Sequence, residues 1–512
     1  MVAVDDLETV ENPLVEGLER APVRSTALVI FGVMGDLASR KLLPGIYNLA
    51  HEGALPERIA LIGISRSPMT DDEFRERARE SIDRFSRRRP DPDVLGGLLA
   101  NMQYVQGQFD DPDLYARLVS SLSEIDTGLG TPLNRVFYLS TAPEFFPVIT
   151  SQLGDAGLNE AEEAEVRVVI EKPIGYDLAS ARAQNEAVLQ YFKESQVFRI
   201  DHYLGKETVQ NLMALRFANA LFEPVWNRNF IDHVQITAAE DIGIGTRAGY
   251  YEGAGALRDL VQNHMLQLLA LLTMEPPTAF EANRLRDEKV KVLEAIAPPA
   301  LDEVAGMAVR AQYGPGVVSG AESVAYREEP GVNPESRTET YAALRLHVNN
   351  WRWAGVPFYL RTGKRMARKL TEIAVTLRPV PHMAFQGPGS TDLQPNQIIV
   401  TLQPDEGVSV SLGAKIPGTK MQIRPVNMEY HYGTSFLSES PEAYERLILD
   451  AMRGDATLFT RNDEVEALWR IIDPVLAAWS ADTTSPVPQY PSGSAGPVEA
   501  NALLDGRSWR RL

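Results

Sequence analysis

Reactive side chains are concentrated in residues 198–207, which read F-R-I-D-H-Y-L-G-K-E. The stretch supplies a carboxylate, an imidazole, a hydroxyl and an ammonium group, carried by Asp201, His202, Tyr203 and Lys206. Apolar residues recur at helical spacing after Gly205, so a helix should begin at this glycine and the following lysine. The N–H groups and positive dipole end of a helix start, with an imidazole, a hydroxyl and an ammonium group beside them, suit a phosphate dianion.

Two other interpretations of this stretch can be weighed from its residues. A P-loop needs a glycine five residues before the Gly-Lys pair and a serine or threonine after it. This chain has Ile200 and Glu207 at those positions, which excludes a P-loop. A plain strand-to-helix turn, with an exposed lysine and a buried Asp–His pair, stays open as a structural alternative.

A strand that runs into a glycine turn occurs early in the sequence. Residues 27–31 are apolar and precede G-V-M-G-D-L, which contributes Gly32, Gly35, Asp36 and Leu37. Glycines at such a turn let the backbone approach a pyrophosphate at a helix start, which indicates a dinucleotide site. The spacing is G-x-x-G rather than G-x-G-x-x-G, so an ordinary strand-to-helix turn is an equal alternative. Pro44 inside the proposed helix predicts a kink or an early end.

The residue after the second strand bears on the choice of cofactor. Residues 59–64 are apolar and lead into Ser65-Arg66-Ser67. An NAD-specific site would place an acidic residue here to bind the ribose hydroxyls, whereas an arginine suits the 2′-phosphate of NADP. The sequence therefore favours NADP, with a solvated loop arginine as the alternative.

Strands and helices alternate over the first 200 residues. Further strands are expected at 135–139 and 166–170, and an amphipathic helix at 72–85. This alternation predicts an α/β domain with a doubly wound parallel sheet of the Rossmann type. The last of these strands leads into a proline-containing turn, which should hold Lys172 at the carboxyl edge of the sheet, where ligands bind.

The pattern changes in the second half of the chain. Strands are expected at 230–240, 340–348, 357–362, 371–378, 397–403 and 406–413. The last five follow one another without helices, which predicts a mostly antiparallel sheet in a larger α+β domain. An apolar helix at 258–272 carries Asp259 and His264. A histidine on such a helix is more often a buried core residue than a base.

The remaining segments complete the expected organisation. The Gly/Pro-rich residues 313–335 should form a long irregular connection, helices at 440–453 and 463–479 should cover the second sheet, and a Pro/Ser/Gly-rich tail follows. We expect three parts: a mobile acidic tail over residues 1–24, a dinucleotide-binding domain over 25–200, and an α+β domain for substrate binding and oligomerisation over 201–512.

Composition excludes several classes of function. The 512 residues carry a formal net charge of −19, which argues against binding to nucleic acid or to an anionic membrane. Cysteine is absent, so disulfides and thiolate chemistry are excluded. The seven histidines lack metal-ligand spacing, so we predict no metal site. Neither an 18-residue apolar run nor a signal pattern occurs, and we expect a cytoplasmic protein.

Taken whole, R-I-D-H-Y-L-G-K-E closely resembles the signature of the glucose-6-phosphate dehydrogenase family. Other strings typical of the family occur in its order between about residue 27 and about residue 480: G-D-L at 35–37, E-K-P at 171–173, R-D-L-V-Q-N-H at 258–264, D-E-K-V-K-V-L at 287–293, N-W-R-W at 350–353 and V-P-F-Y-L-R-T-G-K at 356–364. One departure is Val33-Met34, where the family usually has small residues, and this bears on packing against the cofactor pyrophosphate.

The resemblance implies oxidation of D-glucose 6-phosphate at the anomeric carbon to 6-phospho-D-glucono-1,5-lactone with NADP, the first step of the pentose phosphate pathway. Family members differ in whether they also accept NAD. By the family's pattern, His264 is the general base and Asp201 is its carboxylate partner. The phosphate of the substrate would be bound by His202, Tyr203 and Lys206, joined by Lys364 and Lys369, and the sugar hydroxyls by Glu240 and Asp259. Lys172 would bind between the sugar and the nicotinamide, and the cofactor would be bound by Gly32, Gly35, Asp36, Leu37, Arg66 and Lys172.

These roles agree with elementary chemistry. Oxidation of a C–OH group to a lactone needs a base that takes the hydroxyl proton as hydride leaves the carbon. A neutral imidazole, with an unperturbed pKa of about 6.5, is available for this near neutral pH. A carboxylate on its far nitrogen fixes the tautomer and stabilises the imidazolium that forms.

Two alternatives remain at the level of sequence. Another NAD(P)-dependent sugar dehydrogenase with the same two-domain plan would not need the phosphate cluster at 202–206. A non-catalytic NADP-binding regulator should have lost the base or its partner, yet Asp201 and His264 are both present. By analogy with the family, a broad exposed sheet in the second domain implies a homodimer or homotetramer.

Overall fold

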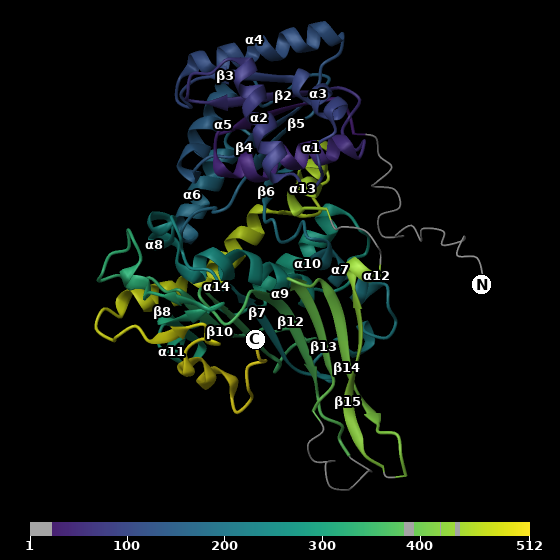
Figure 1. Cartoon of the computed structure of the whole chain (residues 1–512), viewed down its shortest axis with the longest axis vertical. Coiled ribbons are helices and arrows are strands. Elements are labelled where there is room, and N and C mark those ends of the chain that lie inside the picture. Colours follow the sequence, from purple (N-terminus) through teal and green to yellow (C-terminus); the bar gives the residue numbers. More distant parts are fainter. Residues whose placement is uncertain (1–22, 383–393, 420, 436–440) are drawn as a thin grey trace, which may run out of the picture.

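Two β-sheets with helices between them make up the computed structural model, which describes residues 23–382, 394–419, 421–435 and 441–512 (Figure 1). Residues 1–22, which hold most of the predicted acidic tail, lie outside the described residues. Within the described part of the chain, no helix is both long enough and apolar enough to cross a membrane.

Seven strands form the first sheet in the described chain, in the order β16-β6-β5-β4-β1-β2-β3. They are β1 (Thr26–Phe31), β2 (Ile59–Ser65), β3 (Met102–Gln106), β4 (Asn134–Leu139), β5 (Val166–Ile170), β6 (Val197–Ile200) and β16 (Phe459–Thr460). Strands β1 to β6 pair in parallel, and β16 pairs with β6 in the antiparallel sense. The predicted Rossmann-type sheet is confirmed, and its order reverses between β1 and β4, which places a ligand crevice at their carboxyl ends.

Helices cover both faces of this sheet because residues along each strand alternate between two cores. In β1, Leu28 and Ile30 belong to one core, and Val29 and Phe31 to the other. The first core includes residues of η1 (Ala38–Leu42), α1 (Leu43–His51), α2 (Asp71–Phe85) and α3 (Pro92–Ala100). The second includes residues of α4 (Pro112–Leu129) and α5 (Phe146–Asp155), and α6 (Leu178–Leu189) packs on α5.

The break predicted at Pro44 does not occur. The helix runs on to His51, with Pro44 in the first turn of α1, directly after a π-helical segment. The π-helical segment is η1, and its wider turn shifts the backbone hydrogen bonds just before the proline, where the N–H of Leu43 bonds to the carbonyl of Ala38.

The second sheet has ten strands within the described residues, in the order β15-β14-β13-β12-β7-β11-β10-β8-β17, and β9 pairs with β8. They are β7 (Ile231–Ala239), β8 (Ala308–Val318), β9 (Ala321–Ser323), β10 (Tyr341–His347), β11 (Pro357–Gly363), β12 (Leu370–Leu377), β13 (Gln397–Gln403), β14 (Gly407–Lys415), β15 (Ile423–His431) and β17 (Gln489–Ser492). Most pairs are antiparallel, as predicted, whereas β7 with β11 and β8 with β17 are parallel.

Two predictions about irregular segments are wrong. Much of β8 and all of β9 lie within 313–335, and β17 lies in the predicted C-terminal tail. A Cβ atom on Gly316 would come within 2.3 Å of the Ser492 carbonyl oxygen, so this glycine permits close pairing of β8 with β17 rather than a loop.

Long helices occupy the space between the sheets (Figure 1). They include α7 (Glu207–Phe217), α8 (Ala248–Ala256), α9 (Leu266–Thr273), α10 (Ala282–Glu294) and α14 (Asn462–Ala481). The helix predicted at 258–272 is present, but its first part is the π-helix η5 (Leu257–Met265). Shorter elements are η2 (Pro143–Phe145), η3 (Glu194–Gln196), η4 (Glu223–Val225), η6 (Tyr326–Glu328), η7 (Val498–Leu504), α11 (Val304–Met307) and α12 (Tyr432–Ser435).

Helix α13 (Ala443–Arg453) lies elsewhere than predicted. It packs on α1, η1 and β4 of the first sheet instead of covering the second sheet. Glu445 on this helix is buried and pairs with Arg87 at 2.9 Å. The chain therefore returns to the first sheet late in its course, a long-range contact that local pattern cannot predict.

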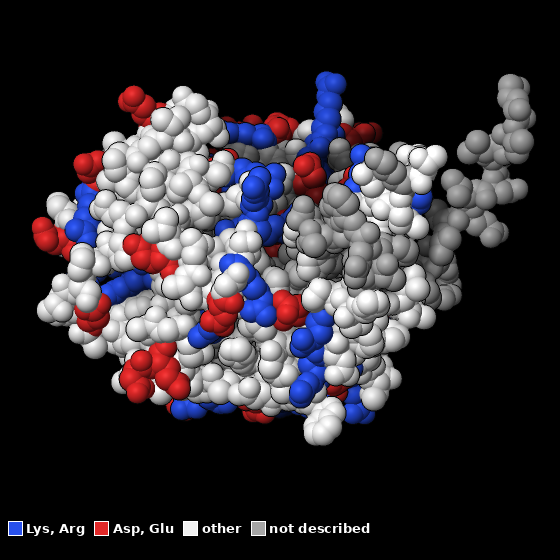
Figure 2. Space-filling view, turned by 90° about the horizontal axis from the view of Figure 1, so that it is seen from below, with Lys and Arg blue, Asp and Glu red and all other residues white. Residues whose placement is uncertain are grey.

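Seen from below, basic and acidic side chains both occur across the face of the molecule (Figure 2). This face therefore carries no extended basic patch of the kind that binds nucleic acid, which agrees with the negative net charge.

Candidate functional site

An Asp–His pair forms where the two sheets approach each other. Asp201 directly follows β6, and His264 lies in η5. The Nδ1 atom of His264 is 2.5 Å from Oδ1 of Asp201, and both side chains are almost fully buried. The Asp201 oxygen also accepts the backbone N–H of Tyr203 at 3.0 Å, which fixes the carboxylate. This arrangement leaves Nε2 of His264 as the nitrogen that can take a proton.

The protonation states of the pair follow from burial and charge. Burial acts to raise the pKa of Asp201, but the imidazoles of His264 and His202 hold it well below its usual value. Burial lowers the pKa of His264, and the nearby Asp201 charge partly opposes this shift. At neutral pH the pair therefore consists of an ionised carboxylate and a neutral imidazole, which is the state a general base needs.

The predicted phosphate-binding groups gather at the start of α7. Lys206 is the N-cap residue of this helix, and its Nζ atom lies 4.4 Å from the centroid of the Tyr203 ring. It donates to Oε1 of Gln403 at 3.2 Å. Burial lowers the pKa of Lys206, Glu406 opposes this, and the charge of the exposed Lys369 lowers it further. Two ammonium groups thus repel each other beside a helix N-terminus, a situation that a bound dianion would relieve.

His202 and Tyr203 lie against the base. The ring of Tyr203 stacks on His264 with a centroid separation of 4.2 Å, and His202 meets it edge-on at 4.6 Å. Burial lowers the pKa of His202 well below its usual value, so it faces a ligand as a neutral imidazole.

A second cluster of charged side chains lies near the Asp201–His264 pair and consists of Lys172, Glu240, Asp259 and Lys364. Lys364 pairs with Oε2 of Glu240 at 2.5 Å and lies 3.9 Å from Asp259. Lys172 donates to the Asp259 carbonyl oxygen at 3.0 Å and lies 3.5 Å from its carboxylate. Burial acts to raise the pKa of Asp259, but Lys172 and Lys364 lower it. The structure thus places Lys364 beside the predicted hydroxyl ligands.

Glu240, Asp259 and Lys364 line a hollow of about 600 Å³, which is large enough for a sugar phosphate. Its lining also includes Arg247, which sequence reasoning missed. The guanidinium of Arg247 lies 4.5 Å from the centroid of the Tyr250 ring, and Tyr250 donates to Asp259 at 3.2 Å. Arg247 lies in a loop with no distinctive pattern, so nothing in the sequence singled it out.

The glycine turn after β1 fits a dinucleotide. Gly32 has a φ of +77°, and a Cβ atom there would lie 2.4 Å from the Ser140 carbonyl oxygen. The hydroxyls of Ser140 and Thr141, at the end of β4, are buried without a hydrogen-bond partner in the described chain. An open backbone cradle beside orphaned hydroxyls suits a pyrophosphate or ribose, and the residues present therefore fit the expected NADP.

The other predicted cofactor residues lie around this turn. The side chain of Val33 is buried in the core and that of Met34 packs partly against it, so the departure from the family pattern is absorbed by packing. Asp36 forms an exposed ion pair with Arg40, and Leu37 precedes η1. Arg66 is exposed at the end of β2, in a hollow of about 740 Å³.

The fold also brings three potential metal ligands together. Ligand atoms of Asp201, His202 and His264 lie within 4.8 Å of one another, which spacing along the chain could not reveal. One atom each of Asp201 and His264 is already engaged in their mutual hydrogen bond, so we assign this cluster to acid–base chemistry.

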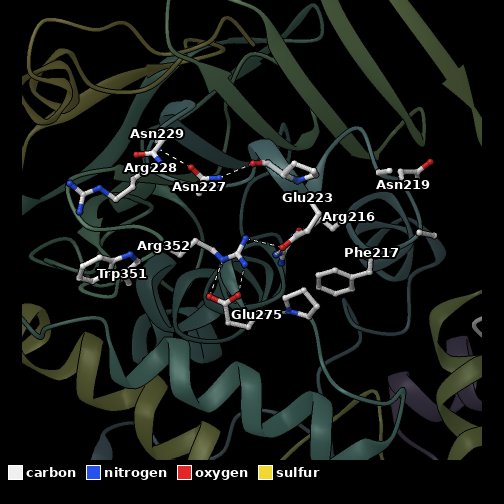
Figure 3. Close-up of a pocket in the computed structure, with 14 residues that line it drawn as sticks. Arg216, Phe217, Asn219, Glu223, Asn227, Arg228, Asn229, Glu275, Trp351 and Arg352 are labelled. Carbon is white, nitrogen blue, oxygen red and sulfur yellow. Dashed lines mark hydrogen bonds and ion pairs between the residues drawn. The ribbon is translucent and has the colours of Figure 1, made fainter.

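A hollow of about 1240 Å³ lies at the C-terminal ends of α7 and α9 (Figure 3). Apart from Arg228, its charged side chains are paired with one another: Arg352 with Glu275 and Glu223, and Arg216 with Glu223. Arg216 also donates to the carbonyls of Leu271 and Met274, which caps the helix that follows His264. This hollow therefore has a structural explanation and is not the candidate site.

Comparisons with known proteins cover both halves of the chain. Residues 29–211 match the glucose-6-phosphate dehydrogenase NAD binding domain, and residues 213–510 match the C-terminal domain of the same family. A glucose-6-phosphate 1-dehydrogenase 2 of Mycobacterium tuberculosis is 48% identical over 94% of each chain. A glucose-6-phosphate 1-dehydrogenase of Chlamydia pneumoniae is 45% identical over 95% of this chain and 96% of its own.

Solved structures give the same result. A glucose-6-phosphate dehydrogenase in complex with glucose 6-phosphate superposes with a TM-score of 0.87 at 34% identity, over 95% of this chain and 99% of that one. A glucose-6-phosphate 1-dehydrogenase from Mycobacterium avium has a TM-score of 0.78 at 38% identity, with the same coverage.

Proposed function

The chain belongs to the glucose-6-phosphate dehydrogenase family, and from this premise we infer that it oxidises D-glucose 6-phosphate to 6-phospho-D-glucono-1,5-lactone and transfers hydride to NADP, the first step of the pentose phosphate pathway. Among observations on this chain itself, the one that carries the inference is the 2.5 Å contact between His264 and Asp201 beside the start of α7. The contact places the base next to the residues that lead into α7.

His264 acts as the general base in this proposal. Its Nε2 atom takes the proton of the anomeric hydroxyl as hydride leaves the carbon. Asp201 holds the Nδ1–H and stabilises the imidazolium as it forms, without taking the proton itself. The buried setting strengthens this charge pairing, since little water competes with it.

The substrate is held at two ends. His202, Tyr203, Lys206 and Lys369 bind the phosphate at the start of α7, and Glu240, Asp259, Lys172 and Lys364 bind the sugar side. Because the phosphate is remote from the reacting carbon, its binding energy serves to align that carbon with His264.

The cofactor lies along the carboxyl edge of the first sheet in this account. NADP supplies the hydride acceptor when bound. Gly32 and Gly35 leave room for the pyrophosphate at the helix that Asp36 and Leu37 open. Arg66 pairs with the 2′-phosphate, and Lys172 separates the sugar from the nicotinamide position. NAD, which lacks the 2′-phosphate, would gain nothing from Arg66 and would be the weaker acceptor.

We also propose a homodimer or homotetramer located in the cytoplasm. The supporting observation is an open face on β14 and β15, where Leu412, Val426 and Met428 are 37%, 36% and 64% exposed. Exposed apolar side chains on a sheet at the edge of a molecule suit contact with a second copy. Light scattering of the purified protein tests this, and a monomer at micromolar concentration would contradict it.

The function itself is tested by following NADPH absorbance with four candidate substrates: glucose 6-phosphate, glucose, and two other hexose phosphates. Glucose 6-phosphate with NADP should give the highest kcat/KM, by orders of magnitude over unphosphorylated glucose. A comparable rate with glucose would favour a different sugar dehydrogenase, and no rate with any sugar would favour a binding protein.

A further inference from the structure

A buried carboxyl without an assigned role lies at the edge of the site. Glu171 directly follows β5 and is 7% exposed. The hydroxyl of Tyr138, on β4, donates to its Oε1 atom at 2.5 Å. The carboxyl of Glu171 also interacts with the hydroxyl of Tyr444, on α13, and raises its pKa. One carboxyl group therefore lies between two strands of the first sheet and a helix that comes late in the chain.

The ring of Tyr444 continues this set of contacts toward the site. It stacks on His202 with a centroid separation of 6.0 Å and an interplanar angle of 11°. His202 in turn meets the ring of His264 edge-on. Glu171 therefore interacts with Tyr444, and the Tyr444 ring packs on His202, the imidazole that we assign to the substrate phosphate.

His202 depends on its ring contacts for orientation. In the described part of the chain, its ring makes no hydrogen bond or ion pair, whereas the ring of His264 is fixed by Asp201. A neutral imidazole can offer an N–H to a phosphate oxygen only when its plane is correctly turned. The ring of Tyr444, on the helix that packs on the first sheet, lies against the face of the His202 ring and restricts its rotation.

Burial of Glu171 has an energetic cost that a purely structural role would not require. Burial raises the pKa of Glu171 to about 7, although Tyr138 and Lys172 oppose the shift and Asp201 adds to it. These three groups and Tyr444 are the titratable groups that face it from β4, its own turn, the end of β6 and α13. Apolar residues of similar size could fill the space at lower cost, so the retained carboxyl indicates a directional role.

We propose that Glu171 and Tyr444 are positioning residues that set the orientation of His202 for the substrate phosphate. Neither side chain touches the substrate; Glu171 holds the Tyr444 hydroxyl, and the Tyr444 ring holds His202. The proposal rests on the proposed function, because it specifies how one phosphate ligand of that same site is held.

The test compares two substitutions, Tyr444→Leu and Tyr444→Phe, by the ratio of kcat/KM for glucose 6-phosphate to kcat/KM for glucose. Tyr444→Leu removes the stacked ring and should lower this ratio about tenfold, chiefly through a higher KM for glucose 6-phosphate. Tyr444→Phe keeps the ring and loses the hydroxyl that interacts with Glu171, so it should lower the ratio about threefold. Glu171→Gln, which keeps the shape but disturbs one tyrosine hydrogen bond, should resemble Tyr444→Phe.

Tyr115→Phe is the matched control. Tyr115, on α4, is also buried against the first sheet, on its other face, and donates to the Phe109 carbonyl at 2.7 Å. It should leave the substrate ratio unchanged even if stability falls. The KM for NADP should stay within about twofold of wild type in all these variants.

The outcomes are distinguishable from failure of the proposed function. A wild-type enzyme inactive on glucose 6-phosphate would overturn the proposed function itself. An active wild type, with Tyr444 variants that slow both sugars by the same factor or keep the wild-type ratio, would overturn the positioning role alone. Should Tyr444→Leu not fold, Tyr444→Phe decides the matter by the same ratio.

Discussion

Phosphate recognition depends, at the scale of single residues, on the ammonium group of Lys206 at the start of α7. We expect Lys206→Ala to lower the preference for glucose 6-phosphate over glucose by about 10- to 100-fold, since a charge-assisted hydrogen bond contributes about 1.5–3 kcal/mol. The slow reaction with glucose should change little, because glucose lacks the group that Lys206 binds. Steady-state kinetics with both sugars measure this.

Lys193 provides the control for that substitution. It is a surface lysine, 75% exposed, that pairs with Glu160 away from the site. Lys193→Ala should leave both reactions unchanged. A Lys206→Ala enzyme that kept the wild-type preference would mean that the phosphate binds elsewhere.

The pH dependence of the reaction should report the environment of His264. The base must be neutral, so kcat/KM rises with pH through its pKa and levels off above it. Burial lowers this pKa from its ordinary value of about 6.5, and the charge of Asp201 partly restores it. The acid limb should therefore lie below pH 6.5. Asp201→Asn removes the charge that raises the pKa, so its acid limb should move to lower pH, with a plateau about 10²-fold lower.

Glucose is the substrate of choice for this pH profile, because its reaction involves no ionisation of a phosphate group. An acid limb that stayed in place or moved to higher pH in Asp201→Asn would contradict the assignment of the pair.

The glycine turn after β1 matters at the scale of elements, because it sets how closely the backbone can approach a cofactor. Gly32→Ala should raise the dissociation constant of NADP by about tenfold or more, since the new methyl group would collide with the Ser140 carbonyl. Gly53 has a similar φ of +68° but no atom within 4 Å of an added Cβ. Gly53→Ala shares the backbone strain without the collision, and equal effects of the two variants on NADP binding would exclude a role for the turn.

Elements with strong local signals were predictable and those defined by distant partners were not. The apolar runs that became β1, β2, β4 and β5 were found because parallel strands buried on both faces read as continuous apolar stretches. Strand β8 was missed because its glycines permit close pairing with β17, a partner far along the chain. The π-helical form of η5 was not predictable from the apolar pattern, which indicates only a helix.

The same distinction holds for the site. Residues 201–206 could be grouped from their spacing alone, whereas the contact of His264 with Asp201 came only from family resemblance, since 63 positions separate them. Arg247 and Tyr444 carried no local signal, because their neighbours in space come from other elements. Glu171 lies in the E-K-P string, but nothing in that string indicates its contacts with Tyr138 and Tyr444.

At the scale of the whole molecule, α13 packs a late segment of the chain against the first sheet and the helices that cover it. Glu445 accepts hydrogen bonds from Arg87 at 2.9 Å and from Asn48 at 2.7 Å, and its side chain is 1% exposed. Glu445→Gln should destabilise the fold by about 1–3 kcal/mol, because it leaves the Arg87 charge poorly paired. Thermal unfolding should show a lower Tm.

Glu466→Gln is the control for this effect. Glu466 joins α14 to Arg182 on α6 through an ion pair whose arginine is 49% exposed, so its loss should cost less than about 1 kcal/mol. A Glu445→Gln protein as stable as this control would mean that the contact of α13 does not contribute to stability.

The most direct test of the account is the turnover of His264→Asn. Asparagine fills much of the same space but cannot act as a base near neutral pH. We expect kcat to fall by about 10²- to 10⁴-fold, with NADP affinity and thermal stability close to those of the wild type. A folded His264→Asn enzyme that bound NADP normally and oxidised glucose 6-phosphate at the wild-type rate would contradict the central claim, because the proton would then leave by another route.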